Sequence, residues 1–139
     1  MNPAFIIIPV VLCVDVVIVL AIGAALRASL APSLAPFPLR PPAPDAVSRN
    51  FQSLRFGLFN LGWCFHMAAD AEWFHIQPSA FARLIRIPAA SIPWTALTDL
   101  RRARLSAYYH ARLGTTPIML PAWCVKEAAR LLDDGHDPG

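Results

Sequence analysis

The chain opens with a long apolar run. From Ala4 to Leu26 the only charged residue is Asp15. As a helix rising about 1.5 Å per residue, this run would be roughly 34 Å long, which is enough to cross the hydrocarbon core of a bilayer. We therefore predict a transmembrane anchor over residues 1–27. The alternative, a cleaved secretory signal, is less favoured because Met1 and Asn2 supply no basic residue and no clean cleavage site follows.

The basic residues near this run predict its orientation. None precedes it, whereas Arg27, Arg40, Arg49 and Arg55 follow it. The positive-inside rule then places the amino terminus outside and the rest of the chain in the cytoplasm. We expect a single-pass protein of the bacterial cytoplasmic (inner) membrane.

Asp15 lies near the centre of the predicted span, where an ionised side chain costs on the order of 2.5–3.5 kcal/mol. One interpretation is a polar contact with a partner helix, and Ala21 and Ala25 would allow that helix to approach closely. The other is a protonated Asp15 that is tolerated because its neighbours are strongly apolar.

Proline dominates the next segment, which is predicted to be an extended linker over residues 28–48. Ala28 to Ala46 holds six of the fourteen prolines. Such a density disfavours helix and sheet, so polyproline II is expected. The linker would lift the following domain from the membrane or lie along a neighbouring surface.

Beyond Ser48 the apolar residues alternate with period two, which is typical of half-buried strands. The phase shifts near Gly57, which indicates a bulge or bend. A hairpin centred on Asp70 and Ala71 would place Phe65 opposite Ile76. One face of that hairpin is then apolar, and the other carries Cys64, His66, His75 and Gln77.

The whole domain is predicted over residues 49–133, followed by a mobile tail over 134–139. A strand is expected at Phe81–Ile87 and a hairpin around Gly114. Thr95–Arg104 is ambiguous, because the spacing of Leu97 and Leu100 fits a helix, whereas the flanking segments favour a turn and then a strand. A helix should begin near Pro121. Its apolar face is predicted to comprise Ala122, Val125, Ala129 and Leu132.

The segment Ala71–Leu100, AEWFHIQPSAFARLIRIPAASIPWTALTDL, resembles small bacterial membrane-anchored proteins with a pleckstrin-homology-like (PH-like or GRAM-like) domain. The resemblance is carried by Ile92-Pro93-Trp94, while Ala71-Glu72 replaces the small glycine turn of that family. It implies a mainly-β (α+β) fold, a bent antiparallel sheet or partial barrel with one C-terminal helix. It also implies binding of a lipid headgroup or a protein surface, without catalytic residues.

Composition supports a membrane protein. Hydrophobic residues make up 56% of the 139 residues and charged residues 15%, against about 25% charged in a typical soluble domain. The net charge of +3 is too small and too dispersed for a nucleic-acid partner. The three cysteines have no disulfide-like or metal-like spacing, which favours free thiols in a reducing compartment.

Few residues suggest chemistry. Cys64, His66 and His75 share one predicted sheet face and have the side chains of a zinc site, but they lack a dependable fourth ligand. A nucleophile and base drawn from Cys64 and His66 would lack an orienting acid. We therefore predict no catalytic, cofactor-binding or metal-ligating residues, and we interpret this face as a polar or partner-facing surface.

Arginines and tryptophans are the better candidates for contacts. Trp63 and Trp94 are expected in the core, while Trp73 and Trp123 are candidates for exposed anchors at an interface, with burial in the core as the favoured alternative. The arginines would dock on an anionic bilayer or form a solvated face. The candidate interface or lipid contacts are Trp73, Arg83, Arg86, Arg101, Arg102, Arg104 and Trp123.

These patterns predict a non-enzymatic accessory subunit that packs its helix and its cytoplasmic domain against a larger integral membrane complex, for example a respiratory or photosynthetic one. The alternative is a membrane-tethered module that binds anionic lipid headgroups. A small enzyme or metal-binding domain is a second alternative.

The predicted topology can be tested with a membrane-impermeant thiol reagent. In intact cells Cys64 and Cys124 should resist labelling, because both would lie in the cytoplasm. Ready labelling of either cysteine would overturn the topology.

Overall fold

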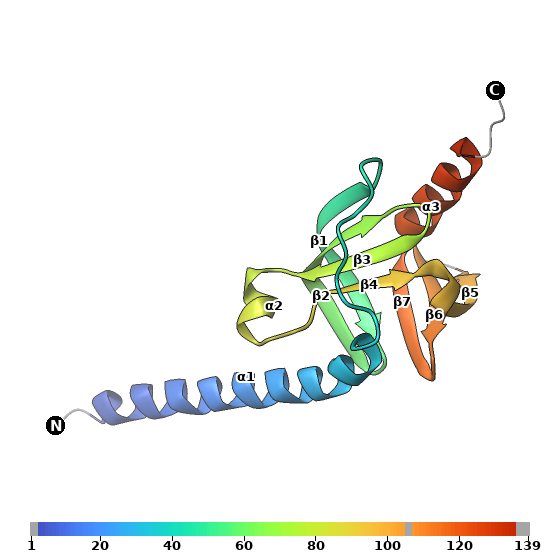
Figure 1. The fold of residues 1–139 in the computed structure, drawn as a ribbon. Helices are drawn as coiled ribbons and strands as arrows, with labels where there is room; N and C mark the ends of the chain where they lie inside the picture. Colours follow the sequence, from blue (N-terminus) through green and yellow to red (C-terminus); the bar gives the residue numbers. More distant parts are fainter. Residues whose placement is uncertain (1–2, 105–106, 136–139) are drawn as a thin grey trace.

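The computed structural model describes residues 3–104 and 107–135 of the chain (Figure 1). A long apolar helix is followed by a domain built on one curled antiparallel sheet, which forms a half-barrel, and by a C-terminal helix. This is the predicted α+β layout. The helices are α1 (Ala4–Leu34), α2 (Ala80–Leu84) and α3 (Ala122–Asp134), with a 3-10 turn η1 (Trp94–Ala96).

The sheet has seven strands in the order β4-β3-β2-β1-β7-β6-β5. They are β1 (Val47–Phe56), β2 (Phe59–Ala69), β3 (Trp73–Pro78), β4 (Ala90–Pro93), β5 (Leu97–Arg102), β6 (Tyr108–Leu113) and β7 (Thr116–Pro121). All pairs are antiparallel, and the sequence-distant pair β1 and β7 joins the two halves of the sheet through Arg55↔Met119 and Phe56↔Ile118.

Helix α1 has two parts with different surroundings. From Phe5 to Ile22 no residue is buried, and the large apolar side chains are 46–78% exposed. Within the described residues α1 is the one helix long and apolar enough to cross a membrane. Its last turns differ, because their spacing gathers one stripe of residues against the sheet. The buried residues of that stripe are Gly23, Leu26, Leu30 and Leu34.

The structure corrects the prediction that no helix survives in the proline-rich segment. Helix α1 continues through Pro32 to Leu34. An interior proline costs roughly 3 kcal/mol, but full burial of Leu30 and Leu34, at 0% and 2% exposed, contributes about 1.5–3 kcal/mol each. Pro36 and Pro38 then withhold the N–H groups that the next turn needs, and the helix ends.

Residues 35–46, which we call the strap, do not lift the domain away from α1. The strap runs back across the sheet beside β3 and β4 (Figure 1). The N–H of Ser91 donates to the carbonyl of Phe37 at 3.2 Å. Because β4 is an edge strand, the strap covers backbone groups that would otherwise be open to pairing with another chain.

The β2–β3 hairpin keeps the predicted faces but not the predicted register. Phe65 lies opposite Pro78, and Met67 lies opposite Ile76. The turn is centred one residue later than predicted, because the Asp70 carboxylate accepts the N–H groups of both Glu72 and Trp73. A shift of one pair leaves each side chain on its original face, since side chains alternate with period two.

Two further predictions need correction. Phe81–Ile87 is not a strand, since α2 and a turn occupy it, with Ala82 completely buried. In α3, Ala122 of the predicted face is buried and Val125 packs against the core, but Ala129 and Leu132 are exposed. The buried residues are Cys124, Ala128 and Leu131 in addition to Ala122. Two neighbouring apolar columns run along α3, and packing on the sheet selects one of them. The predicted tail lies outside the described residues from residue 136 onward.

Other predicted elements are confirmed. The hairpin around Gly114 pairs Leu113 with Thr116, although residues 105–106 of the predicted strand lie outside the described residues. The ambiguous segment Thr95–Arg104 forms the end of η1 and then β5. The bulge or bend predicted near Gly57 needs correction, because the chain makes a complete hairpin turn there, with Phe56 paired to Phe59, and the register irregularities lie between Arg49 and Leu54.

The close approach of α1 to the chain after α2 can be tested at Gly23. A Cβ at this position would lie 3.0 Å from the Cβ of Ile85. Gly23→Val should therefore push the two segments apart and lower the free energy of unfolding by about 1–3 kcal/mol, measured by thermal unfolding of the full chain in detergent. Ala25→Val, at an exposed position of α1, is the matched control. Equal stability of the two variants would show that this packing is not formed.

Candidate functional site

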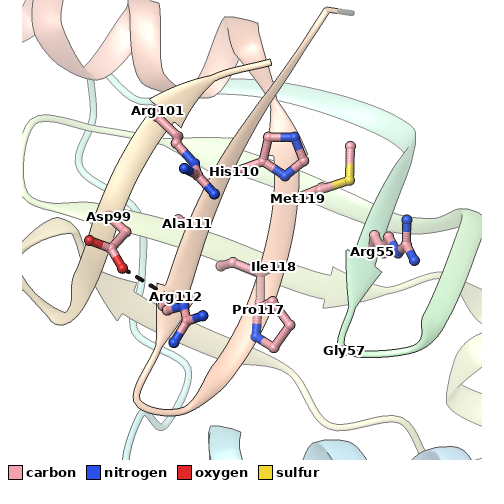
Figure 2. Close-up of a pocket in the computed structure, with 10 residues that line it drawn as sticks. All are labelled: Arg55, Gly57, Asp99, Arg101, His110, Ala111, Arg112, Pro117, Ile118 and Met119. Carbon is pink, nitrogen blue, oxygen red and sulfur yellow. Dashed lines mark ion pairs between the residues drawn. The ribbon is translucent and has the colours of Figure 1, made fainter. Parts of the chain in front are cut away.

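A basic pocket lies on the exposed face of the sheet, across β5, β6, β7 and β1 (Figure 2). Cross-strand pairing sets its central row, in which Arg101 lies opposite His110, His110 opposite Met119, and Met119 opposite Arg55. Paired residues point to the same face. The pocket has a volume of about 190 Å³ and is open to solvent.

The charge of this pocket is only partly compensated. Asp99 lies 3.7 Å from Arg112, and both side chains are more than half exposed, so the pair stabilises little. Within the described residues, Arg55 and Arg101 pair with no carboxylate. The arrangement is suited to a carboxylate or phosphate group. Sequence analysis named Arg101 but missed His110, which the hairpin around Gly114 could have placed, and Arg55, which needs the non-local β1–β7 pair.

A second polar cluster is buried where the strap crosses β3 and β4. His75 lies opposite Ser91, and its Nδ1 is 2.7 Å from the Ser91 Oγ, while its Nε2 is 3.0 Å from Asp70 Oδ2. All three residues are at most 3% exposed. We call them the Asp70–His75–Ser91 chain. Sequence analysis placed His75 on a polar sheet face but did not foresee that the strap would cover it.

Backbone N–H groups of the strap form hydrogen bonds with the two outer residues of this network, Ser91 and Asp70. The N–H of Arg40 donates to the Ser91 Oγ at 2.7 Å, and the N–H of Ala43 donates to Asp70 Oδ2 at 3.2 Å. With the Nε2–H tautomer, His75 donates to Asp70 and accepts from Ser91, so every polar group is satisfied. Asp70, His75 and Ser91 are the residue types of a hydrolytic triad, but the Ser91 hydroxyl is fully buried and already hydrogen-bonded. Their geometry is that of a clamp for the strap.

Asp70 is the electrostatic centre of the clamp. Burial alone would raise the pKa of its carboxyl group. Hydrogen bonds from His75, Ala43, Trp73 and Glu72 outweigh burial and hold the pKa of Asp70 below its ordinary value. The charged form is therefore the one that the fold stabilises.

The cysteines and His66 do not assemble a metal site. Among residues 3–104 and 107–135, no group of three or more His, Cys, Asp or Glu side chains is arranged to hold a metal ion. Burial raises the pKa of the Cys64 thiol, which disfavours the thiolate that nucleophilic chemistry needs. The buried His66 Nδ1 has no hydrogen-bond partner, and its ring lies edge-on to Phe51 with 4.9 Å between the ring centroids. Cys124 is completely buried, so its resistance to a thiol reagent would not report topology.

The tryptophans are distributed differently from the prediction. Trp73 and Trp123 are each half-buried beneath an arginine, with guanidinium-to-ring distances of 4.6 Å from Arg40 and 4.8 Å from Arg49. Trp94 packs on the core at Phe74, close to expectation.

Trp63, expected in the core, is instead 76% exposed. Its φ of +57° and that of +52° at Phe51 fall where the β1–β2 register is irregular. The irregular backbone turns both aromatic side chains outward and breaks the alternation that predicted a buried Trp63.

The remaining predicted contacts fall at opposite ends of the molecule. Arg83 and Arg86 lie in and after α2, beside α1, whereas Arg101 and Arg102 lie on β5, away from the apolar part of α1 (Figure 1). Arg104 is exposed in the turn after β5.

Asp15, Ala21 and Ala25 are all exposed on α1. At about 100° per residue, Asp15 projects roughly 120° and 80° away from the directions of Ala21 and Ala25. The helix therefore does not bring these three positions together as one narrow stripe.

Comparison of the chain with known protein families, curated proteins and solved structures finds no match. The resemblance to PH-like domains remains a prediction, and the roles of individual residues rest on their geometry here.

The clamp predicts how stability depends on pH. Asp70→Asn would place an amide nitrogen against a donor N–H of the strap, and we expect the free energy of unfolding at pH 7 to fall by about 1.5–3 kcal/mol. Because the folded pKa lies below the unfolded value of about 3.9, the contribution of Asp70 is complete above about pH 5 and is lost as the pH falls through the folded pKa.

Denaturant unfolding of the full chain in detergent, at neutral and acidic pH, measures both effects. The acid loss should be smaller in Asp70→Asn than in the wild type. The exposed Asp99→Asn is the control and should change little. Equal acid sensitivity of wild type and Asp70→Asn would contradict the clamp.

Proposed function

We propose that this protein is a non-enzymatic, single-pass accessory subunit that packs α1 and its β domain against a larger integral membrane complex. The observation that carries the proposal is Asp15. It lies within an exposed run of apolar side chains, and within the described part of the chain no side chain pairs with it. A polar group on a neighbouring helix would remove the cost of leaving this carboxyl group in lipid.

The join between α1 and the domain supports a scaffold role. Leu26, Leu30 and Leu34 belong to the same buried cluster as the sheet, and the strap is hydrogen-bonded to β4. A domain attached in this way follows the orientation of the helix. A partner that binds α1 would therefore also determine which face of the domain it meets.

The domain offers two exposed aromatic side chains to such a partner. Phe51 and Trp63 are 60% and 76% exposed, and aromatic residues are enriched at protein interfaces. The left-handed backbone at both positions holds them outward. We propose them as domain contacts, in addition to the predicted α1 contacts at Asp15, Ala21 and Ala25.

The proposed location is the bacterial cytoplasmic membrane, with the amino terminus outside and the domain in the cytoplasm. Support comes from the arginines, since Arg27 on α1 lines the same cleft as Arg86, at the end of α1 nearer the domain. Positive charge is favoured on the cytoplasmic side. The free cysteines fit a reducing compartment.

The alternative function, binding of anionic lipid headgroups, is less well supported at Arg101 and Arg102. They lie on the side of the domain away from α2 and the apolar part of α1 (Figure 1). A headgroup of the bilayer that α1 crosses would meet Arg83 and Arg86 instead. For the second alternative, an enzyme or metal-binding domain, the described residues offer no group of three or more His, Cys, Asp or Glu side chains arranged to hold a metal ion, and the Ser91 hydroxyl is buried.

Substitution of Asp15 tests the proposal. Asp15→Leu should retain membrane integration and release co-purifying subunits in mild detergent. Loss of an interhelical hydrogen bond of about 1–2 kcal/mol corresponds to roughly five- to thirty-fold weaker association. Cys13→Leu, two residues away and also exposed, is the matched control and should keep the subunits. A wild-type chain that purifies alone, or an Asp15→Leu chain with the same subunits as wild type, would contradict the proposal.

A further inference from the structure

Helix α2 exposes apolar side chains beside α1. It connects β3 to β4, and its buried residue Ala82 faces the domain. Phe81 and Leu84 point away from the core and are 60% and 79% exposed. Their spacing of three residues places them on one side of the short helix. Within the described residues, no other part of the domain packs over them.

The position of this segment along α1 is well defined. Gly23 lies against Ile85, with room for no side chain larger than hydrogen without a close contact. Residues from both segments line one cleft of about 350 Å³. The cleft comprises Leu20, Gly23, Ala24 and Arg27 of α1 and Leu84, Ile85 and Arg86 of the α2 segment. Leu84 is therefore at the level of Leu20 to Arg27.

That level coincides with the end of the predicted span. The fully exposed apolar part of α1 runs to Ile22, and Arg27 is the first basic residue after it. From Ala4 to Ile22 the helix is about 28 Å long, close to the roughly 30 Å of a bilayer hydrocarbon core. Leu20 then lies at the hydrocarbon edge, and Arg27 lies among the headgroups.

The chemistry of the segment fits this depth. Arg27, Arg83 and Arg86 are all exposed, and within residues 3–104 and 107–135 none forms an ion pair. Apolar side chains that enter the interface beside cations directed at phosphates are typical of segments that lie on a membrane. Figure 1 shows α2 on the side of the domain that faces along α1 toward its amino terminus.

We infer that α2 is a second membrane contact, in which Phe81 and Leu84 enter the interface of the leaflet where α1 ends, and Arg27, Arg83 and Arg86 bind anionic lipid phosphates. The inference rests on α1 spanning the membrane, as proposed above, but not on any protein partner. Two contacts fix the rotation of the domain about the axis of α1, which a single helix would leave free.

A fluorescent label at position 84 tests this contact. The full chain, with Cys13→Ala and Cys64→Ala, carries Leu84→Cys or the control Leu132→Cys, an exposed position on α3. Each is labelled with an environment-sensitive dye and reconstituted into phosphatidylcholine vesicles, with or without phosphatidylglycerol. We expect the label at 84, but not at 132, to shift to shorter emission wavelength and to be quenched by lipids with a spin label near the headgroup.

Substitution of the arginines provides a second test of the membrane contact. Arg83→Gln with Arg86→Gln should lower the docked-to-undocked ratio of the label at 84 about five-fold per arginine in vesicles containing phosphatidylglycerol. The matched pair Arg102→Gln and Arg104→Gln, both exposed and outside the basic pocket, should leave it unchanged. Added salt should weaken docking of the wild type.

The outcomes separate this inference from the proposed function. A label at 84 that behaves like the label at 132 would overturn it, and would indicate that α2 faces water or a protein. A label at 84 with emission at shorter wavelength would also overturn the inference if lipid quenchers and arginine substitutions did not affect it. In that case α1 alone would cover α2. Extraction of the chain by alkaline carbonate would refute the membrane anchoring on which both proposals rest.

Discussion

The structure depends on one hydrophobic contact, in which the last turns of α1 pack against the sheet. The sequence pattern places these two segments in separate parts of the protein. Leu26, Leu30 and Leu34 complete the interior that the sheet begins. Without them, the sheet would expose apolar surface to water. Each Å² of that surface would cost about 25 cal/mol of folding free energy. Helix α1 is exposed along its first part and buried along its last turns. It therefore connects the exposed apolar segment to the domain without a flexible hinge.

The strap strengthens this join with polar contacts. Buried polar groups destabilise a fold unless each has a partner, and low dielectric makes a fully satisfied network strong. Here Asp70, His75 and Ser91 satisfy one another and also bind the backbone at Arg40 and Ala43. A displaced strap would lose the hydrogen bonds that the Arg40 and Ala43 N–H groups donate to Ser91 and Asp70, so the network favours one position of the strap, in which the strap protects the edge of β4.

The sequence predicts well the features that depend on local pattern. The apolar run of α1, the hairpin around Gly114 and the final helix all follow from periodicity and turn residues. The β2–β3 hairpin is half predictable, since alternation gives its faces but the side chain of Asp70 shifts its turn. Phe81–Ile87 could not be assigned from pattern alone, because a short apolar segment suits a strand or a helix, and packing of Ala82 decides.

The candidate sites were less predictable, because they combine distant segments. Arg55 reaches the basic pocket only through the pairing of β1 with β7. Ser91 meets Arg40 across 51 positions, and no local signal marks either residue. Trp63 shows a different failure, since two residues with left-handed backbone reverse an alternation that otherwise places it inside. Tertiary contacts override local preference at these points.

The shared interior of α1 and the sheet also bears on how the chain matures. The strands follow the helix during synthesis, and domains generally fold as their segments emerge. The sheet can close only on turns of α1 that are already helical and correctly placed. With α1 spanning a membrane, as proposed above, insertion would precede completion of the fold. On that proposal, a chain inserted at the wrong depth would withhold Leu26 and Leu30 from the sheet and leave its interior uncovered, so correct folding would depend on correct insertion.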